Sequence, residues 1–127
     1  MIDDKTLPTP APEERQVIQA YGPGRFRVSN VVYEHAVLVL PDRTLRWDAA
    51  DATHITAETL APLRQAGVEL LLIGGGARAP QVTPELRAWL RENGIVVEGM
   101  DTGAACRTYG VLLAEGRRVA AALLPVA

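Results

Sequence analysis

The feature that most constrains the fold is a near-continuous apolar run at residues 68–73 (VELLLI), which Gly74, Gly75 and Gly76 follow at once. Such a run is typical of a β-strand covered on both faces, as the strands of parallel sheets are. Parallel strands need long crossover connections, which are usually helices. The run therefore predicts an α/β fold with helices beside it in the sequence.

The segments after the glycines alternate between helix and strand signals. Thr83 is a suitable N-cap, Pro84 is favoured at the first helical position, and Gly94 follows the periodic stretch, so a helix is expected between them. The remaining segments predict a strand over 95–98, a helix over 102–115 capped by Asp101, and a strand over 117–124. This order, with short links, predicts parallel neighbours joined by right-handed crossovers.

Upstream of the apolar run, turn residues recur about every ten residues without a helical period, which favours an antiparallel hairpin or meander. Strands are expected over 16–21, 26–28, 31–40 and 44–47. A helix over 57–66 then leads into the apolar run, with Thr56 as its N-cap and Pro62 disturbing its first turn. The two halves together predict a central mixed sheet with helices on its faces, and the early hairpin as an additional layer or edge.

Residues 1–14 combine three prolines with polar side chains, so a mobile N-terminal arm is expected there. They show neither the basic region nor the apolar stretch of a secretory signal, and we expect a cytoplasmic protein. A chain of 127 residues has the length of one domain, so residues 15–127 are expected to form a single α/β domain.

The composition argues against several classes of function. A net charge of −2 provides no basic footprint for nucleic acid or for an anionic membrane surface. One cysteine and two histidines provide no cluster of metal ligands, and no cofactor is predicted. No apolar run reaches the roughly 18 residues that cross a bilayer, so membrane insertion is not expected.

The glycine loop is the most specific local motif. With Arg78 it matches the relaxed dinucleotide pattern G-x-G-x-x-A over 74–79, but residues 80–82 separate the glycines from the next helix, which disfavours a dinucleotide site. Two alternatives remain. The glycines form a turn that needs their backbone freedom, or they cradle a small anion or ligand at the carboxyl end of a parallel strand, with Arg78 adding charge.

The start of the 102–115 helix supplies the other candidates. Asp101, Thr102 and Arg107 are candidate ligand-binding residues, and Glu98 with Asp101 is a possible acid–base pair, although Asp101 also suits a helix cap. Cys106 is a candidate reactive thiol, because the helix N-terminus and the neighbouring arginine are expected to lower its pKa. A catalytic thiol also needs a base, and no pattern places a histidine beside it. The alternative is a buried small residue.

Several stretches together resemble a known family. They are YGPGRF at 21–26, the strand end at 39–41, LIGGG at 72–76, PEL at 84–86, VEGMDTGAACRTY at 97–109, and the segment 112–125. Over residues 15–126 the chain is similar to a small family of unknown function found in bacteria, archaea and eukaryotes. Its mitochondrial members are assembly factors for respiratory complex I, and another eukaryotic branch is linked to adipocyte differentiation.

The resemblance implies a three-layer α/β fold, with a central mixed sheet flanked by helices and a β-hairpin packed beside it. It implies no established enzyme activity, cofactor or catalytic residue. Gly110 stands where the family pattern usually has asparagine, in the middle of an expected helix, where glycine costs about 1 kcal/mol relative to alanine.

Three functions follow as hypotheses. The first is a non-catalytic binding or assembly module with a protein partner, which the resemblance and the missing nucleophile–base pair favour. The second is a protein that binds a small molecule or anion through the loop 74–78 and the helix start at Asp101. The third is an enzyme that uses Cys106 or the pair Glu98 and Asp101.

Overall fold

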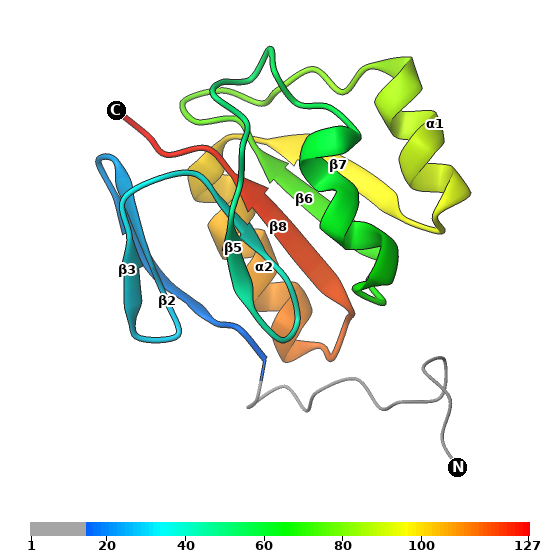
Figure 1. The fold of residues 1–127 in the computed structure, drawn as a ribbon. Coiled ribbons are helices and arrows are strands. Elements are labelled where there is room, and N and C mark those ends of the chain that lie inside the picture. Colours follow the sequence, from blue (N-terminus) through cyan, green and yellow to red (C-terminus); the bar gives the residue numbers. More distant parts are fainter. Residues whose placement is uncertain (1–14) are drawn as a thin grey trace.

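The computed structural model describes residues 15–127, so the arm predicted over 1–14 lies outside the described residues. Within residues 15–127 the strands form two sheets, a central one and a small one (Figure 1). The central sheet contains β4 (Val37–Val39), β5 (Thr44–Arg46), β6 (Leu70–Gly74), β7 (Val96–Met100) and β8 (Val119–Leu123). The small sheet contains β1 (Ile18–Gly22), β2 (Arg25–Val28) and β3 (Val31–Tyr33). The helices are η2 (Glu58–Gln65), α1 (Pro84–Glu92) and α2 (Thr102–Ala114).

The central sheet is mixed, as predicted. Its strand order is β5-β4-β8-β6-β7, in which β6 runs parallel to β7 and β8, and β4 runs antiparallel to β5 and β8. The apolar run forms β6, whose residues 71–73 are completely buried, and every residue of β8 is buried. Burial on both faces explains why these strands show no alternation of apolar and polar residues.

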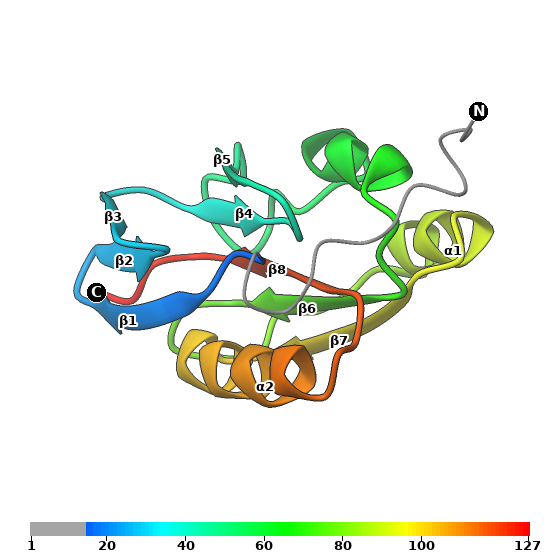
Figure 2. The same ribbon diagram turned by 90° about the horizontal axis from the view of Figure 1, so that it is seen from below.

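Two apolar clusters lie on opposite faces of the central sheet. Alternate residues of β6 divide between them: Leu71 and Ile73 belong to the cluster beneath η2 and α1, whereas Leu72 belongs to the cluster beneath α2 and the small sheet. Figure 2 shows α2 on one side of the sheet and η2 on the other. The predicted three layers are therefore present. One layer contains η2 and α1, the middle layer is the central sheet, and the third contains α2 and the small sheet.

The small sheet is antiparallel and packs beside α2. Phe26 and Val28 point inward from β2 and share the second cluster with Tyr109 of α2. The Tyr109 hydroxyl donates a hydrogen bond to the Gln16 carbonyl at 2.6 Å, just before β1. The predicted additional hairpin layer is therefore confirmed, and α2 is the element that holds it.

The single strand predicted over 31–40 is wrong. This stretch forms β3 and β4, which belong to different sheets, and residues 34–36 between them are outside both. Ala36 turns toward the chain beyond β5, because its carbonyl accepts a hydrogen bond from the Trp47 N–H at 2.9 Å. β-branched composition predicts extended backbone, but it contains no signal for a change of sheet.

The helix predicted over 57–66 is a 3₁₀ helix, η2, rather than an α-helix. Thr56 is not its N-cap; its hydroxyl accepts a weak hydrogen bond from the Thr59 N–H at 3.3 Å, and Ala57 occupies the cap position. Pro62 lacks an N–H and its ring conflicts with the carbonyl four residues earlier, which disfavours α-helical bonding here. Both other caps are confirmed: Thr83 accepts from the Leu86 N–H, and Asp101 accepts from the Ala104 N–H.

Among the described residues, none of the helices has the length and apolarity that crossing a membrane requires.

Candidate functional site

The glycine loop meets the start of α2 and the end of β8 at one buried junction. The Thr102 hydroxyl accepts a hydrogen bond from the Gly76 N–H at 2.8 Å and donates one to the Leu124 carbonyl at 2.6 Å. The backbone N–H of Thr102 donates to the Gly76 carbonyl at 2.9 Å. Thr102 is completely buried, and its hydroxyl group both donates and accepts a hydrogen bond within the protein.

The close approach of these segments explains two of the glycines. A Cβ atom on Gly74 would lie 2.9 Å from both Cα and Oγ1 of Thr102, and one on Gly75 would overlap the Arg78 carbonyl and Pro80. These two positions therefore need glycine so that the backbone segments can approach closely. This agrees with the first alternative, in which the glycines serve a turn. Small-anion binding at this loop stays a prediction, to which these contacts add no support.

The structure brings only some of the predicted ligand residues together and places the others elsewhere on the surface. Gly74, Gly76 and Thr102 are buried in the junction, and the Asp101 carboxylate caps α2 at its edge. Arg78 is exposed on the loop. Arg107 is exposed on α2, where it borders a different part of the surface with Cys106.

Cys106 does not have the lowered pKa that its helical position predicted. Burial raises the pKa of the thiol to about 11, and the neighbouring Arg107 only partly offsets this effect. The histidines contact other groups: His54 Nδ1 bonds to Asp51, and His35 Nδ1 bonds to the Ala36 carbonyl. Desolvation of the thiolate therefore outweighs the favourable charges.

A groove separates β1 from the exposed side of α2. It has a volume of about 400 Å³, with residues 18–21 of β1 on one side and Cys106, Arg107 and Gly110 of α2 on the other. Gly110 lies in this wall with open space beyond it, because a Cβ atom built there would meet no atom within 4 Å. At one end Tyr21 lies over Gly103, where a Cβ atom would overlap the tyrosine hydroxyl. Sequence reasoning missed this groove, since no motif marks the β1 side.

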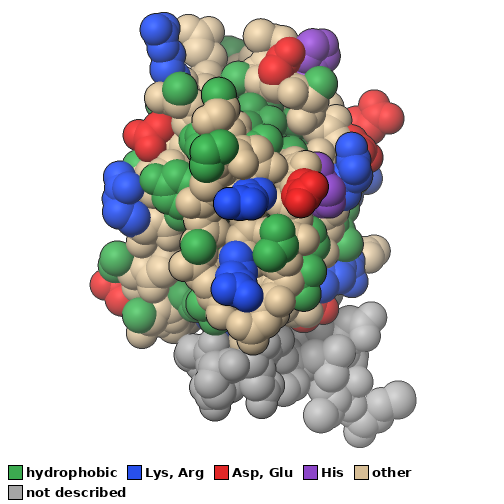
Figure 3. Space-filling model, turned by 90° about the vertical axis from the view of Figure 1, so that its left-hand side faces the viewer, with side chains coloured by type: hydrophobic (Ala, Val, Ile, Leu, Met, Phe, Trp, Pro, Cys, Tyr) green, Lys and Arg blue, Asp and Glu red, His purple; other side chains and the backbone are tan. Residues whose placement is uncertain are grey.

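A second hollow lies on the outer face of the small sheet. Its volume is about 380 Å³, and it shares Ala20 and Tyr21 with the groove. Arg25, Arg27 and Val32 lie around it. Figure 3 looks onto this side of the molecule and shows basic side chains near the centre, with an acidic and a histidine side chain beside them and hydrophobic side chains around them. The linings of the two hollows beside β1 thus combine apolar side chains with the arginines Arg25, Arg27 and Arg107.

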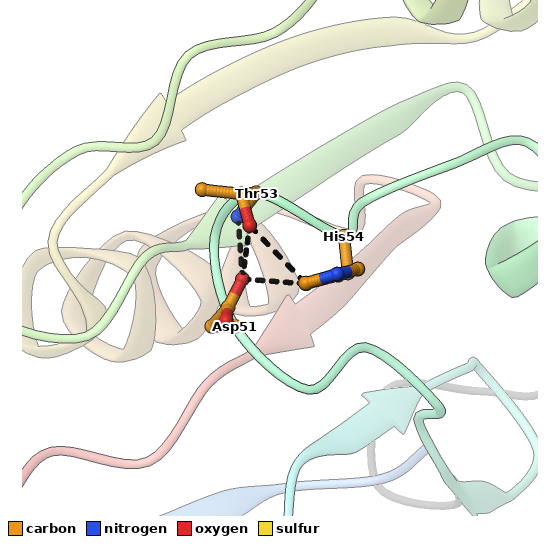
Figure 4. Close-up of polar contacts among 3 residues, drawn as sticks. All are labelled: Asp51, Thr53 and His54. Carbon is orange, nitrogen blue, oxygen red and sulfur yellow. Dashed lines mark hydrogen bonds and ion pairs between the residues drawn. The ribbon is translucent and has the colours of Figure 1, made fainter.

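A separate polar cluster lies in the loop before η2 (Figure 4). The Asp51 carboxylate accepts hydrogen bonds from the Thr53 N–H at 2.8 Å, the Thr53 hydroxyl at 2.6 Å and His54 Nδ1 at 2.8 Å. The Thr53 hydroxyl, followed by His54, lowers the pKa of Asp51 to about 2. All three side chains are exposed and bond to one another, which is typical of a loop-stabilising turn. In the described part of the chain, no three potential metal-ligating His, Cys, Asp or Glu side chains gather.

A mixed central sheet with helices on both faces and a small antiparallel sheet beside α2 defines a small three-layer α/β protein. Residues 18–124 match the family model described as "Protein of unknown function (DUF498/DUF598)". The chain belongs to this family.

Relatives and a solved structure agree with this assignment. An uncharacterized protein of Rhodobacter capsulatus is 41% identical over 86% of this chain and 84% of its own length. "NADH dehydrogenase [ubiquinone] 1 alpha subcomplex assembly factor 3" of Danio rerio is 35% identical over 86% of this chain, which spans only 64% of that protein. A crystal structure of a Bordetella parapertussis protein is 41% identical, with a TM-score of 0.81 and coverage of 87% of this chain and 96% of that one.

Proposed function

We propose that this chain is a non-catalytic protein-binding module that takes part in assembling a protein complex. The observation that carries the proposal is the apolar, positively charged surface around β1. Of the six large hydrophobic side chains exposed among the described residues, four lie on or next to the small sheet: Val17, Tyr21, Val31 and Val32. Concentrated exposed apolar groups mark interaction surfaces, and tyrosine and arginine are enriched where proteins bind one another.

The relatives support this reading of the surface. An assembly factor acts on other proteins. The assembly factors 3 of Danio rerio and Xenopus tropicalis are 35% and 30% identical to this chain. They are longer than the matched region, so their partners belong to this chain only as part of the proposal. The raised pKa of Cys106 and the engaged histidines support a role without catalysis. A free thiol in a chain with one cysteine supports action in a reducing compartment, which we propose to be the cytoplasm.

The test is affinity purification of the full chain at native expression, with quantitative mass spectrometry of what accompanies it. We expect a partner in stoichiometric amount, which the double variant Arg25→Glu/Arg27→Glu no longer retains. The matched control is Arg87→Glu/Arg91→Glu, because these exposed arginines lie on α1, away from the small sheet. The absence of any stoichiometric partner of the unsubstituted chain contradicts the proposed function.

A further inference from the structure

We propose that the groove between β1 and α2 receives a short extended segment of a partner protein, which adds a strand to the edge of β1 and places a carboxylate on Arg107. This rests on the proposed function and names the place and chemistry of binding. The segment would alternate between apolar and acidic residues. The source is a second protein, rather than a small ligand, because the groove offers a strand edge as well as a charge.

The edge of β1 is available for backbone pairing. Among the described residues, β1 pairs with β2 on one side and has no strand on the other. Unpaired edge strands present a row of N–H and C=O groups that another strand can complete. Irregular structure bounds this edge at both ends. At one end the pairing of β1 with β2 shifts register between Ile18 and Ala20, and at the other Pro23 forms an isolated bridge with Val126. The available edge is therefore only a few residues long, which favours a short segment.

Helix α2 forms the other wall of the groove and leaves room for side chains. Gly110 is exposed with open space beyond it, and Cys106 is half-buried in the wall. On a docked strand, successive side chains point to opposite sides, so one set faces this wall and the other faces solvent. The half-exposed ring of Tyr21, at 41% exposure, provides apolar contact area at the end of the groove.

The charge of the groove selects the segment. Arg107 is the charged residue of its lining, and it has neither an ion pair nor a hydrogen bond to any described residue. Arg25 and Arg27, around the adjoining hollow, are likewise exposed and unpaired within the described residues. An arginine binds a carboxylate through paired hydrogen bonds, which are stronger than neutral ones. Acidic residues on the partner segment complement this surface, and basic residues are repelled.

The test uses short random peptides displayed on phage and selected against the full chain. Enriched sequences are synthesised, and their binding is measured by fluorescence anisotropy and by chemical-shift changes of the backbone amides. We expect sequences in which apolar residues alternate with Asp or Glu, with the largest shift changes over residues 18–22 and 106–110. Arg107→Ala should weaken binding about tenfold or more, because a hydrogen bond to a charged group is lost.

Three substitutions at one position separate groove volume from charge. Gly110→Ala leaves the groove open and should bind as the unsubstituted chain does. Gly110→Gln fills it, and Gly110→Glu fills it and places a carboxylate one helical turn from Arg107, so binding should fall in that order. All three have a higher helix propensity than glycine, so none of them is expected to unfold α2. Sequences without acidic residues, shift changes elsewhere, or equal binding by the Ala and Glu variants overturn the groove assignment.

The two proposals fail in different ways. If a stoichiometric partner is recovered but Gly110→Glu and Arg107→Ala retain it and the peptides do not enrich, the groove assignment is wrong and the binding function stands. If no partner is recovered, the proposed function is wrong as well.

Discussion

Two regions of α2 differ in their burial and in their hydrogen bonding. The first turn, at Thr102, is buried and hydrogen-bonded to the glycine loop and to the chain after β8. The second and third turns, at Arg107 and Gly110, border an open groove, and the Arg107 guanidinium group has no ion pair or hydrogen bond to any of residues 15–127. The region with the more specific sequence motif is the sealed one. A glycine-rich motif therefore records tight packing here, and the open surface nearby carries the proposed binding role.

The strongest test of the sealed region is Thr102→Val, which removes the hydroxyl and keeps the shape. The Gly76 N–H and the Leu124 carbonyl would stay buried without partners, which costs roughly 2–6 kcal/mol of unfolding free energy for the two groups together. Urea unfolding measures this loss. Thr102→Ser keeps the hydroxyl and should cost about 1 kcal/mol or less, for one lost methyl group. Equal losses for Val and Ser would show that the hydroxyl does not hold the junction.

The two regions should respond in opposite directions to the same change, glycine to alanine. Gly74→Ala places a Cβ atom 2.9 Å from the Thr102 backbone, and we expect a loss of about 1–3 kcal/mol from overpacking. Gly110→Ala meets open space in a helix, and we expect a gain of about 0.5–1 kcal/mol. Thermal and urea unfolding of both variants decide the matter. The same sign at both positions would remove the distinction between a sealed and an open region.

Tyr109→Phe tests the contact by which α2 holds the small sheet. The buried hydroxyl donates to the Gln16 carbonyl at 2.6 Å, and its removal should cost about 1–2 kcal/mol. Hydrogen exchange should speed up most in β1 and β2, since their anchor is weakened. Uniform acceleration across the central sheet would show that this bond does not act locally.

The smallest effect is expected in the Asp51 loop, away from both regions of α2. The pKa of Asp51 is lowered to about 2 in the folded state, so its contribution to stability is present above pH 3.8 and is lost as the pH falls from 3.8 to about 2. Asp51→Asn should therefore be slightly less stable than the unsubstituted chain at neutral pH and equal to it at about pH 2. A difference that persists unchanged at pH 2 contradicts this assignment.

The architecture of the second half could be predicted because its signals are local. The run that forms β6, the cap Thr83 and the cap Asp101 each act within a few residues of themselves. The first half was predicted less well, because the break between β3 and β4 depends on which sheet each half joins. That choice is made by tertiary contacts, which leave no periodic pattern in residues 31–40.

The candidate site shows the same division. The sequence marked Gly74, Thr102 and Arg107 as one group, whereas the structure gives the first two to a buried junction and the third to a groove. The β1 wall of that groove was not predicted, because its contribution is an unpaired backbone edge and not a set of side chains. The lowered pKa predicted for Cys106 was wrong, because the burial of its thiol depends on how α2 packs, which its sequence neighbours do not reveal.

The most direct test of the account compares recovery of the native partner by Gly110→Glu and Gly110→Ala in affinity purification at native expression. Both variants fold at least as well as the unsubstituted chain by helix propensity, and they differ in whether the groove stays open to an acidic strand. The account predicts that Gly110→Ala retains the partner in stoichiometric amount and that Gly110→Glu loses most of it. Equal recovery by the two variants would contradict the claim that the groove between β1 and α2 is where the partner binds.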